Sequence, residues 1–229
     1  MITPRSFVAA LSEVQLNGVF NPYRNRCEMH DLADGPVVRH ENLRRYLSAI
    51  EQLGTDTIWM GRDLGYRGGR RTGLALTDEY HLPVFAKSYP GTSPSKATKG
   101  PAVAERTAAE IWAMLSLLDR RPLLWNVFPL HPHEPGDPMT NRRFTSRELA
   151  AVTELNCALV EWLGIKRIVC IGQDATKYAS IFGVSVDSVR HPSYGGVMEF
   201  RRGIRRIYGL EFWSPSMRKQ SELFQLGSG

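Results

Sequence analysis

Residues 58–79 read IWMGRDLGYRGGRRTGLALTDE, and this stretch decides the fold. Its first three residues are apolar, as expected near the end of a buried strand, and Gly61 ends the apolar run. One acid, Asp63, follows, and then a loop in which glycines and arginines alternate. Glycines let a ligand approach the backbone closely, and arginines donate forked hydrogen bonds to phosphate. The pattern indicates chemistry on a phosphate-bearing substrate, although a surface loop with solvated arginines is the simpler alternative.

The length and composition predict one globular domain. The chain has 229 residues and a hydrophobic content of 42%, which suffices for a sizeable core. We therefore expect a single domain over residues 1–229, without internal repeats. Within it, residues 1–37 have a mixed pattern and are expected to form an N-terminal extension. Residues 221–229, which end in Gly-Ser-Gly, are expected to form a flexible tail.

Membrane and metal-binding patterns are missing from the sequence. No apolar run is long enough to span a bilayer, and the first residues lack the apolar segment of a signal peptide. The three cysteines stand far apart and form no CxxC pair, so neither a zinc site nor an iron–sulfur cluster is indicated. We expect a monomeric cytoplasmic protein that needs no metal and no other cofactor.

The charge favours a nucleic-acid partner without proving one. The formal net charge is +6, and the isoelectric point is about 9.4. Arginine carries most of this excess, and arginine is the residue best suited to phosphate recognition. Many basic proteins bind no nucleic acid, so the charge needs support from specific motifs.

Short apolar runs alternate with amphipathic segments along the chain. This order predicts an α/β fold with a central, mainly parallel sheet, because parallel neighbours need helical crossovers. The four expected strands are Thr57–Gly61, Leu123–Phe128, Arg167–Gly172 and Ser185–Val189. The expected helices are Pro4–Leu16, His40–Leu53, Ala102–Leu118, Ser146–Leu163 with Ser146 as its cap, Asp174–Phe182 and an arginine-rich segment, Met198–Tyr208.

Polar side chains stand where three of these strands end. Asp63 follows the first strand, Asn126 lies near the end of the second, and His191 follows the fourth. Ligands of open parallel sheets bind at the carboxyl ends of the strands. We therefore expect these three side chains to share one site. Taken singly, Asp63 could instead cap its loop, Asn126 could tie a strand end to a loop, and His191 could be an ordinary turn histidine.

Three segments together resemble the signature regions of the uracil-DNA glycosylase superfamily. They are GRDLGYRGGRRTG at 61–73, LLWNVFPLHPHEPGDPMTNR at 123–142 and RHPSYGG at 190–196. The resemblance extends over roughly residues 57–209. It implies a three-layer α/β/α sandwich around the four-stranded sheet. It also implies a DNA repair enzyme that hydrolyses the N-glycosidic bond of uracil in DNA and leaves an abasic site.

The resemblance implies a role for each matched residue. Asp63 would orient the attacking water, and His191 would stabilise the departing uracil anion. Asn126 would read the flipped base, since its amide presents both a donor and an acceptor. The expected base pocket consists of Gly61, Tyr66, Asn126 and Phe128.

Several positions depart from the family pattern. The acid stands in the third motif position, as in the GQDPYH-type enzymes, whereas four-cysteine members place a glutamate where this chain has Arg62. The tyrosine that blocks the thymine methyl aligns with Gly65, one place before Tyr66. The aromatic residue that stacks on uracil aligns near Leu76, which leaves Phe128 or Tyr66 as substitutes.

DNA contacts are expected from two further segments. The intercalating leucine of the third motif aligns with Gly195, so a wedge must come from a neighbouring bulky residue. Basic and hydroxyl side chains would hold the phosphates flanking the flipped nucleotide. The expected DNA-binding residues are Ser95, Lys96, Ser193, Tyr194, Val197, Met198, Arg201 and Arg202.

Two alternatives remain open. The chain could bind damaged or single-stranded DNA without catalysis, although a binder has no need of an acid at Asp63. It could also release another base, such as xanthine, hypoxanthine or thymine. Metal binding by His131 and His133 is disfavoured, because no acid or cysteine stands nearby in ligand order.

Overall fold

The computed structural model describes residues 1–210, and the expected tail at 221–229 lies outside them. A four-stranded sheet forms the centre of the molecule, with every neighbouring pair of strands parallel. Its order is β3 (Leu123–Phe128), β2 (Thr57–Asp63), β5 (Arg167–Ile171) and β6 (Ser185–Val189). The predicted α/β class and parallel sheet are confirmed. β2 runs two residues further than expected, so Asp63 is its last residue.

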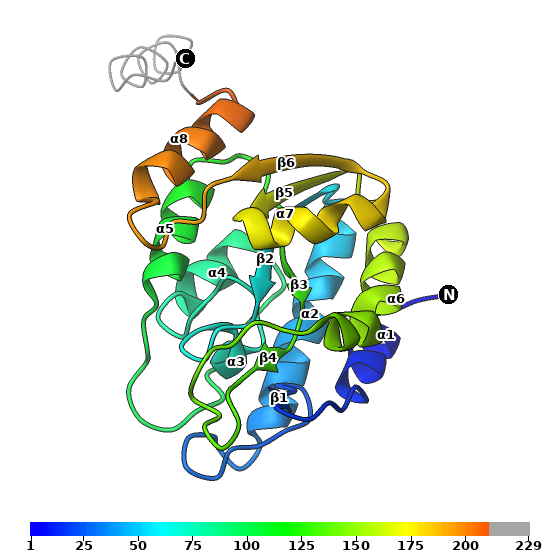
Figure 1. Cartoon of the computed structure of the whole chain (residues 1–229), viewed down its shortest axis with the longest axis vertical. Helices are drawn as coiled ribbons and strands as arrows, with labels where there is room; N and C mark the ends of the chain where they lie inside the picture. The colour runs from blue at the N-terminus through cyan, green and yellow to red at the C-terminus, as the bar shows by residue number, and fades with distance from the viewer. Residues whose placement is uncertain (211–229) are drawn as a thin grey trace, which may run out of the picture.

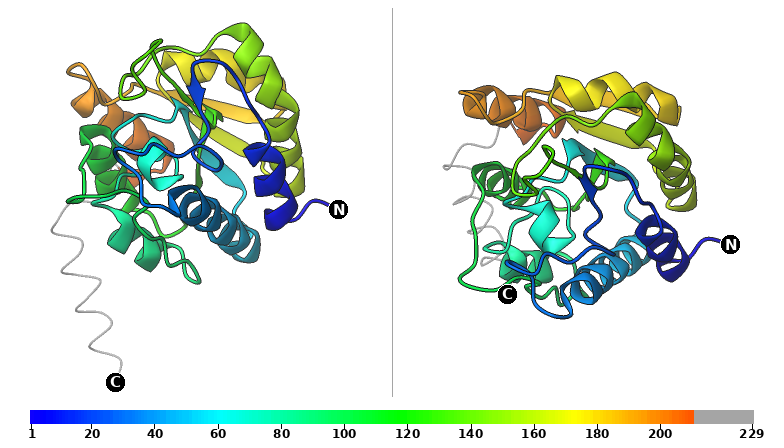
Figure 2. Two further views of the ribbon diagram at one scale, coloured as in Figure 1. Left: turned by 90° about the horizontal axis from the view of Figure 1, so that it is seen from below. Right: turned by 60° about the horizontal axis from the view of Figure 1, so that its bottom comes forward.

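Helices cover both faces of the sheet (Figures 1 and 2). On one face, the Trp125 ring contacts Phe7 of α1 (Pro4–Ser12) and donates a 2.9 Å hydrogen bond to Asn156 of α6 (Ser146–Trp162). On the other face, Trp59 packs edge-on against Phe200 of α8 (Val197–Ile207). At the edge of the sheet, the Tyr46 hydroxyl of α2 (Gly35–Leu53) accepts a hydrogen bond from the Leu124 amide of β3, and its ring packs against Phe85 and Tyr89. The expected three-layer arrangement is confirmed.

Helix bounds differ from the sequence pattern at several ends. α5 covers only Arg106–Leu115, and α2 begins at Gly35, five residues before the expected start. The cap of α6 is Thr145 rather than Ser146, because the Thr145 hydroxyl and the Glu148 carboxylate form a reciprocal capping box. The expected helix at 174–182 is α7 (Gln173–Ala179) followed by a single 3₁₀ turn.

The expected N-terminal extension is part of the core. Phe7 and Leu11 of α1 are buried, and β1 (Val19–Phe20) pairs antiparallel with β4 (His131–Pro132). This pairing anchors the long loop after β3. The segment thus packs on the sheet through α1 and on the loop after β3 through β1.

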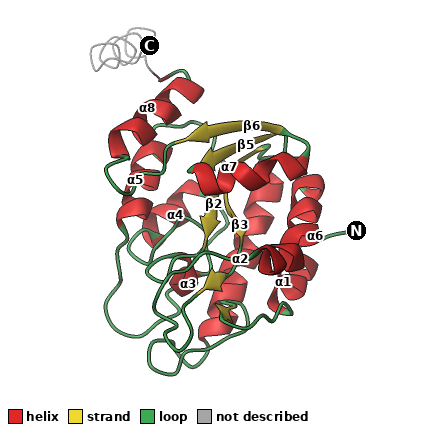
Figure 3. Cartoon of the chain, viewed as in Figure 1, coloured by secondary structure: helices red, strands yellow, loops and turns green. Residues whose placement is uncertain are grey.

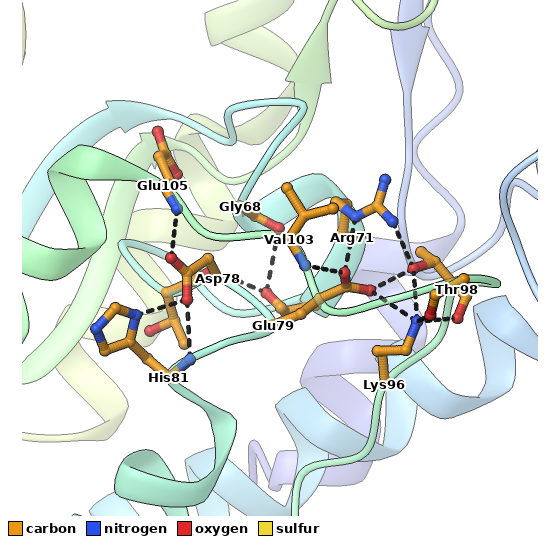
Figure 4. Close-up of polar contacts among 12 residues, drawn as sticks. Gly68, Arg71, Asp78, Glu79, His81, Lys96, Thr98, Val103 and Glu105 are labelled. Atoms are coloured by element: carbon orange, nitrogen blue, oxygen red, sulfur yellow. Dashed lines mark hydrogen bonds and ion pairs between the residues drawn. The ribbon is translucent and has the colours of Figure 1, made fainter.

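Two short helices interrupt the long connection between β2 and α5. They are α3 (Gly69–Thr72) and α4 (Leu82–Ser88), and Figure 3 shows extended loops around them on the side to which β2 and β3 point. Buried acids fix these loops (Figure 4). Glu79 accepts hydrogen bonds from Arg71, Thr98 and the Val103 amide, and Asp78 accepts from the amides of His81 and Glu105.

Within residues 1–210, no helix combines the length and hydrophobicity needed to cross a bilayer. The same residues contain no group of three or more histidine, cysteine, aspartate or glutamate side chains suited to a metal ion.

Candidate active site

The carboxyl end of β2 presents a nearly buried carboxylate. The Asp63 side chain is only 7% exposed, and it accepts a 2.6 Å hydrogen bond on Oδ2 from Nε of Arg62. Burial raises the pKa of the Asp63 carboxyl, and the Arg62 guanidinium opposes that change. Arg62 also reaches Asp174 of α7, at 3.3 Å from Nη1. The predicted acid therefore lies at the strand end, paired with its neighbour in sequence.

Asn126 lies directly beside Gly61 in the register of β3 and β2. It is 1% exposed, and among the described residues neither Oδ1 nor Nδ2 has a hydrogen-bond partner. The amide occupies the space that a side chain on Gly61 would fill, and Leu76 approaches the same space to 2.9 Å. Buried amides are almost always hydrogen-bonded, so an unpartnered one at a strand end indicates a ligand site.

The aromatic residues expected to stack on a base differ in position. Phe128 pairs with Asp63 in the register, and it is fully buried with its ring 5.3 Å from that of Phe144. Stacking on a base would therefore require Phe144 or another neighbour to move. Tyr66 is partly exposed in the loop after β2, where its amide donates to Asn141. Leu76, with a left-handed φ of 54°, offers an apolar surface next to Gly61 and Asn126.

His191 follows β6 and packs against the end of β5. A side chain at Gly172 would meet the Cβ of His191 at 3.1 Å, so the glycine allows the histidine to lie close to the sheet. The backbone amide of Ser193 donates to Nδ1 at 3.1 Å, and the Ser193 hydroxyl lies 2.7 Å from the same atom. Since a backbone amide only donates, Nδ1 is the acceptor and the ring proton of neutral His191 resides on Nε2.

Electrostatics keep this histidine neutral. Burial lowers the pKa of His191 first, and the positive charges of Arg62 and Arg190 lower it further. The strand ends thus present a carboxylate at the end of β2, an amide in β3 without a partner among the described residues, and an imidazole after β6 whose neutral form is favoured. The sequence predicted that these three side chains would share one site. β3 and β2 are neighbours in the sheet, and β6, which His191 follows, lies beyond β5, so the shared site stays a prediction.

Comparison with known proteins identifies the architecture. No family model matches the sequence, and no curated protein matches it. The structure is similar to the crystal structure of SMUG2 from Pedobacter heparinus, with a TM-score of 0.63 over 92% of this chain and 99% of that one, at 15% sequence identity. SMUG2 belongs to the uracil-DNA glycosylase superfamily. The chain has the uracil-DNA glycosylase fold.

In this uracil-DNA glycosylase fold, the loop after His191 presents one side chain fully to solvent. Tyr194 is 97% exposed and has a left-handed φ of 52°, followed by Gly195 with a φ of 78°. A side chain on Gly196 would collide with the His191 carbonyl, so the turn requires glycine there. Met198, the second residue of α8, is 64% exposed. Of the expected wedge residues, Tyr194 projects furthest from the fold.

The basic residues of α8 divide into two kinds. Arg201 forms a two-point ion pair with Glu110 of α5, with nitrogen–oxygen distances of 2.7 and 3.0 Å. Arg202 is exposed and makes no ion pair within the described residues. Arg201 therefore joins two helices, and phosphate contact remains a prediction for both residues.

The connection before α5 also contains one residue bound within the protein and one that is exposed. The Lys96 ammonium donates to the backbone oxygens of Thr98 and Gly100 and lies 3.8 Å from the Glu79 carboxylate. Ser95 is exposed, although Asn42 binds its backbone amide and carbonyl. Lys96 thus has an internal role that its position in a Pro-rich stretch did not reveal, and Ser95 retains a hydroxyl for a phosphate.

Three charged residues near Asp63 were not predicted from the sequence. Arg62 and Asp174 hold Asp63 in an ionic chain, and Glu105 at the start of α5 places its carboxylate against Gly68 and, at 3.4 Å, against the side-chain position of Gly65. Burial and the Asp78 carboxylate raise the pKa of Glu105. The only signal in the sequence was Arg62, which stands at the motif position where the resemblance places a glutamate in the four-cysteine enzymes.

Proposed function

We propose that the protein is a DNA glycosylase that hydrolyses the N-glycosidic bond of uracil in DNA and leaves an abasic site. The observation that carries the proposal is the Asn126 amide, which is buried without a hydrogen-bond partner among the described residues and adjoins the strand that ends in Asp63. A buried side-chain amide with its oxygen acceptor and its nitrogen donor both unused can bind the neighbouring donor and acceptor on the edge of a pyrimidine.

Base recognition follows from the two amide atoms. Oδ1 of Asn126 would accept the N3–H of uracil, and Nδ2 would donate to O4. Cytosine would present an amino donor to Nδ2 and an unprotonated N3 to Oδ1, so both contacts would be lost. Since the buried amide would then remain unpaired, the energetic penalty for cytosine is expected to be large.

Bond cleavage requires stabilisation of two developing charges. Positive charge grows on the sugar, where the ionised Asp63 would stabilise it and orient the attacking water. Negative charge grows on the departing base, where the Nε2–H of His191 would donate to the uracil O2. A neutral donor suffices because the leaving anion is delocalised, and the orientation of His191 is fixed by Ser193.

The target base must leave the helix before it can reach these residues. Base flipping costs stacking energy, and the enzyme would recover it through contacts with the vacated space and the flanking phosphates. Tyr194 is the best placed residue for the first task, because it is the most exposed member of its loop. Ser95, Ser193 and the arginines of α8 would serve the second.

A gel assay tests the proposal. Oligonucleotides that carry uracil, thymine, hypoxanthine or xanthine at one position are incubated with the protein, and abasic sites are cleaved with alkali. We expect strand cleavage at uracil, and a loss of several orders of magnitude in Asp63→Asn with DNA binding retained. Equal turnover by wild type and Asp63→Asn would refute the mechanism. Binding without release of any base would identify a non-catalytic DNA-binding protein, and release of a purine alone would reassign the substrate.

A further inference from the structure

Arg62 has a geometry that ordinary strand alternation does not predict. It directly precedes Asp63 in β2, and successive residues of a strand point to opposite faces. Here the strand ends, and the Arg62 side chain turns back to its neighbour. Nε lies 2.6 Å from Oδ2 of Asp63, whereas Nη2 lies 3.5 Å from Oδ1.

The guanidinium is held from its far side as well. Nη1 of Arg62 lies 3.3 Å from Oδ2 of Asp174, and Arg143 approaches the same oxygen to 3.4 Å. Arg62 is 31% exposed and Asp63 only 7%, so the pair is largely shielded from water. An arginine fixed at both ends has little rotational freedom, and it fixes the carboxylate it contacts.

The two carboxylate oxygens of Asp63 therefore differ. Oδ2 is occupied by a short bond from Arg62, and Oδ1 is contacted only at the limit of hydrogen-bond distance. The weakly engaged Oδ1 is the atom left to hold a water molecule. Charged and titratable groups from other elements also surround the pair: Asp174 in α7, Arg142 before α6, Glu105 before α5, and the neutral His191 with Arg190 after β6.

We propose that Arg62 is a positioning residue for base release, which holds Asp63 ionised and leaves its Oδ1 free for the attacking water. The predicted effect of Arg62 on base release rests on the proposed glycosylase function, whereas its effect on the ionisation of Asp63 does not. The ion pair itself acts in the free protein. Arg62 stands at a motif position where no role was assigned, and the alternative for such a partly exposed arginine is a contact with a DNA phosphate.

The first experiment measures the ionisation of Asp63 without DNA. Carbon-13 NMR follows its side-chain carboxyl between pH 3 and 9, and the signal is assigned by its absence in Asp63→Asn. Removal of the nearby positive charge in Arg62→Gln should raise the Asp63 pKa by about one to three pH units. Arg143→Gln is the matched control, because Arg143 contacts Asp174 but not Asp63. It should leave the Asp63 titration nearly unchanged.

The second experiment measures base release. Because only ionised Asp63 is active, the acid limb of the kcat profile should move to higher pH in Arg62→Gln. At a pH below the limb, kcat should fall about tenfold for every pH unit by which the limb moves. Arg62→Lys keeps the charge but lacks the fork, so it should restore the position of the acid limb and only part of kcat. KM for DNA should change little.

The outcomes separate the two proposals. An unchanged Asp63 titration in Arg62→Gln overturns the role of Arg62, as does a loss confined to KM that weakens with added salt, which would identify a phosphate contact. If Arg62→Gln does not fold, Arg62→Lys tests the proposal instead. An unchanged kcat in Arg62→Lys would show that the forked guanidinium group of Arg62 does not position Asp63. Absence of base release by the wild type would refute the glycosylase function, while the titration would still decide the ion pair.

Discussion

Gly61 of β2 and Asn126 of β3 are register partners, and the Asn126 amide lies in the space where a Gly61 side chain would be. Gly61→Ala should therefore displace the amide without disturbing Asp63, the proposed catalytic acid, two residues away. Overpacking of this kind costs about 1–3 kcal/mol. If this cost is lost from base recognition, kcat/KM should fall about 5- to 150-fold, because about 1.4 kcal/mol corresponds to a tenfold change; single-turnover kinetics on uracil measure the loss.

Gly65→Ala is the control for this substitution. A methyl group there would meet its nearest atom, Oε1 of Glu105, at 3.4 Å, which is close to an ordinary contact. Uracil release should therefore change little. Wild-type kinetics in Gly61→Ala, with its thermal unfolding unchanged, would show that the Asn126 amide is not held in place by Gly61.

Asn126→Asp tests which base is read. The carboxylate presents a second acceptor where the uracil O4 requires a donor, so uracil release should fall and discrimination against cytosine should relax. The measurement compares release of uracil and cytosine from otherwise identical oligonucleotides. Asn156→Asp is the comparison variant on the opposite face of the sheet, where the amide accepts from Trp125 and donates to the Val127 carbonyl; since a carboxylate cannot donate, the variant should lose stability but keep the wild-type preference for uracil over cytosine. Unchanged kinetics on both bases would remove Asn126 from the pocket.

The pH dependence of base release should have an acid limb and no alkaline limb near neutrality. Burial raises the pKa of Asp63 above its usual value, and activity requires the ionised form. Burial lowers the pKa of His191 below its usual value, so that the neutral form required for Nε2–H donation prevails at pH 7. Both groups therefore reduce activity as the pH falls through their respective pKa values.

A profile of kcat/KM between pH 4 and 9 checks this expectation. His191→Asn should lower kcat and remove one of the two ionisations from the acid limb. A rise in activity as the pH falls below 6 would contradict the neutral-donor mechanism, because it would require a protonated His191.

β2, β3 and β5 were predictable because each contains a short, continuous apolar run, and β6 because valines are interspersed with polar residues in it; the expected bounds of β3 and β6 match the structure. The two-residue strands β1 and β4 are too short to show any period. α4 was missed for a similar reason: seven residues, with Pro83 in its first turn, contain less than two helical turns.

The site was only partly predictable. Asp63 and His191 could be located because each stands within three residues of the end of a predicted strand. The neighbours that control them come from tertiary structure: Asp174 begins another helix, and Glu105 follows a long loop. Arg62 was visible in the sequence, but strand alternation placed it away from Asp63. Sequence patterns thus locate residues along the chain, whereas charge pairing depends on where the loops pack.

The stability of the fold depends on a buried ion pair under the N-terminal segment. Nη2 of Arg39 lies 2.9 Å from Asp31, and both side chains are fully buried. Arg70 is buried nearby, without a hydrogen-bond partner among the described residues and with its guanidinium 4.1 Å from the Phe20 ring centroid. Asp31→Asn would leave both cations uncompensated, so it should destabilise the protein by about 3–5 kcal/mol.

Urea unfolding measures this loss. Glu13→Gln is the control, because its pair with Arg24 is exposed and should contribute almost nothing. Equal midpoints for Asp31→Asn and wild type would show that the Arg39 charge is stabilised by groups other than Asp31. The Phe20 ring, which both Arg39 and Arg70 approach, would then be the next candidate.

Tyr194 provides the final test, which concerns how the base leaves the helix. A residue that is 97% exposed in a left-handed conformation gains nothing from packing within its own fold. Its position is explained if the ring enters the space vacated by the flipped nucleotide. Tyr194→Ala should therefore lose more activity on duplex than on single-stranded DNA, since an unpaired base is already accessible.

The same assay separates the wedge from the phosphate contacts. Arg202→Gln should weaken both substrates alike and flatten the salt dependence, because phosphate contacts do not distinguish paired from unpaired bases. Val197→Ala and Met198→Ala, in the first turn of α8, should lose less duplex activity than Tyr194→Ala. Equal losses on duplex and single strand for all three alanine variants would show that this loop contains no wedge, and that strand opening depends on another segment, with residues 88–99 as the next candidate.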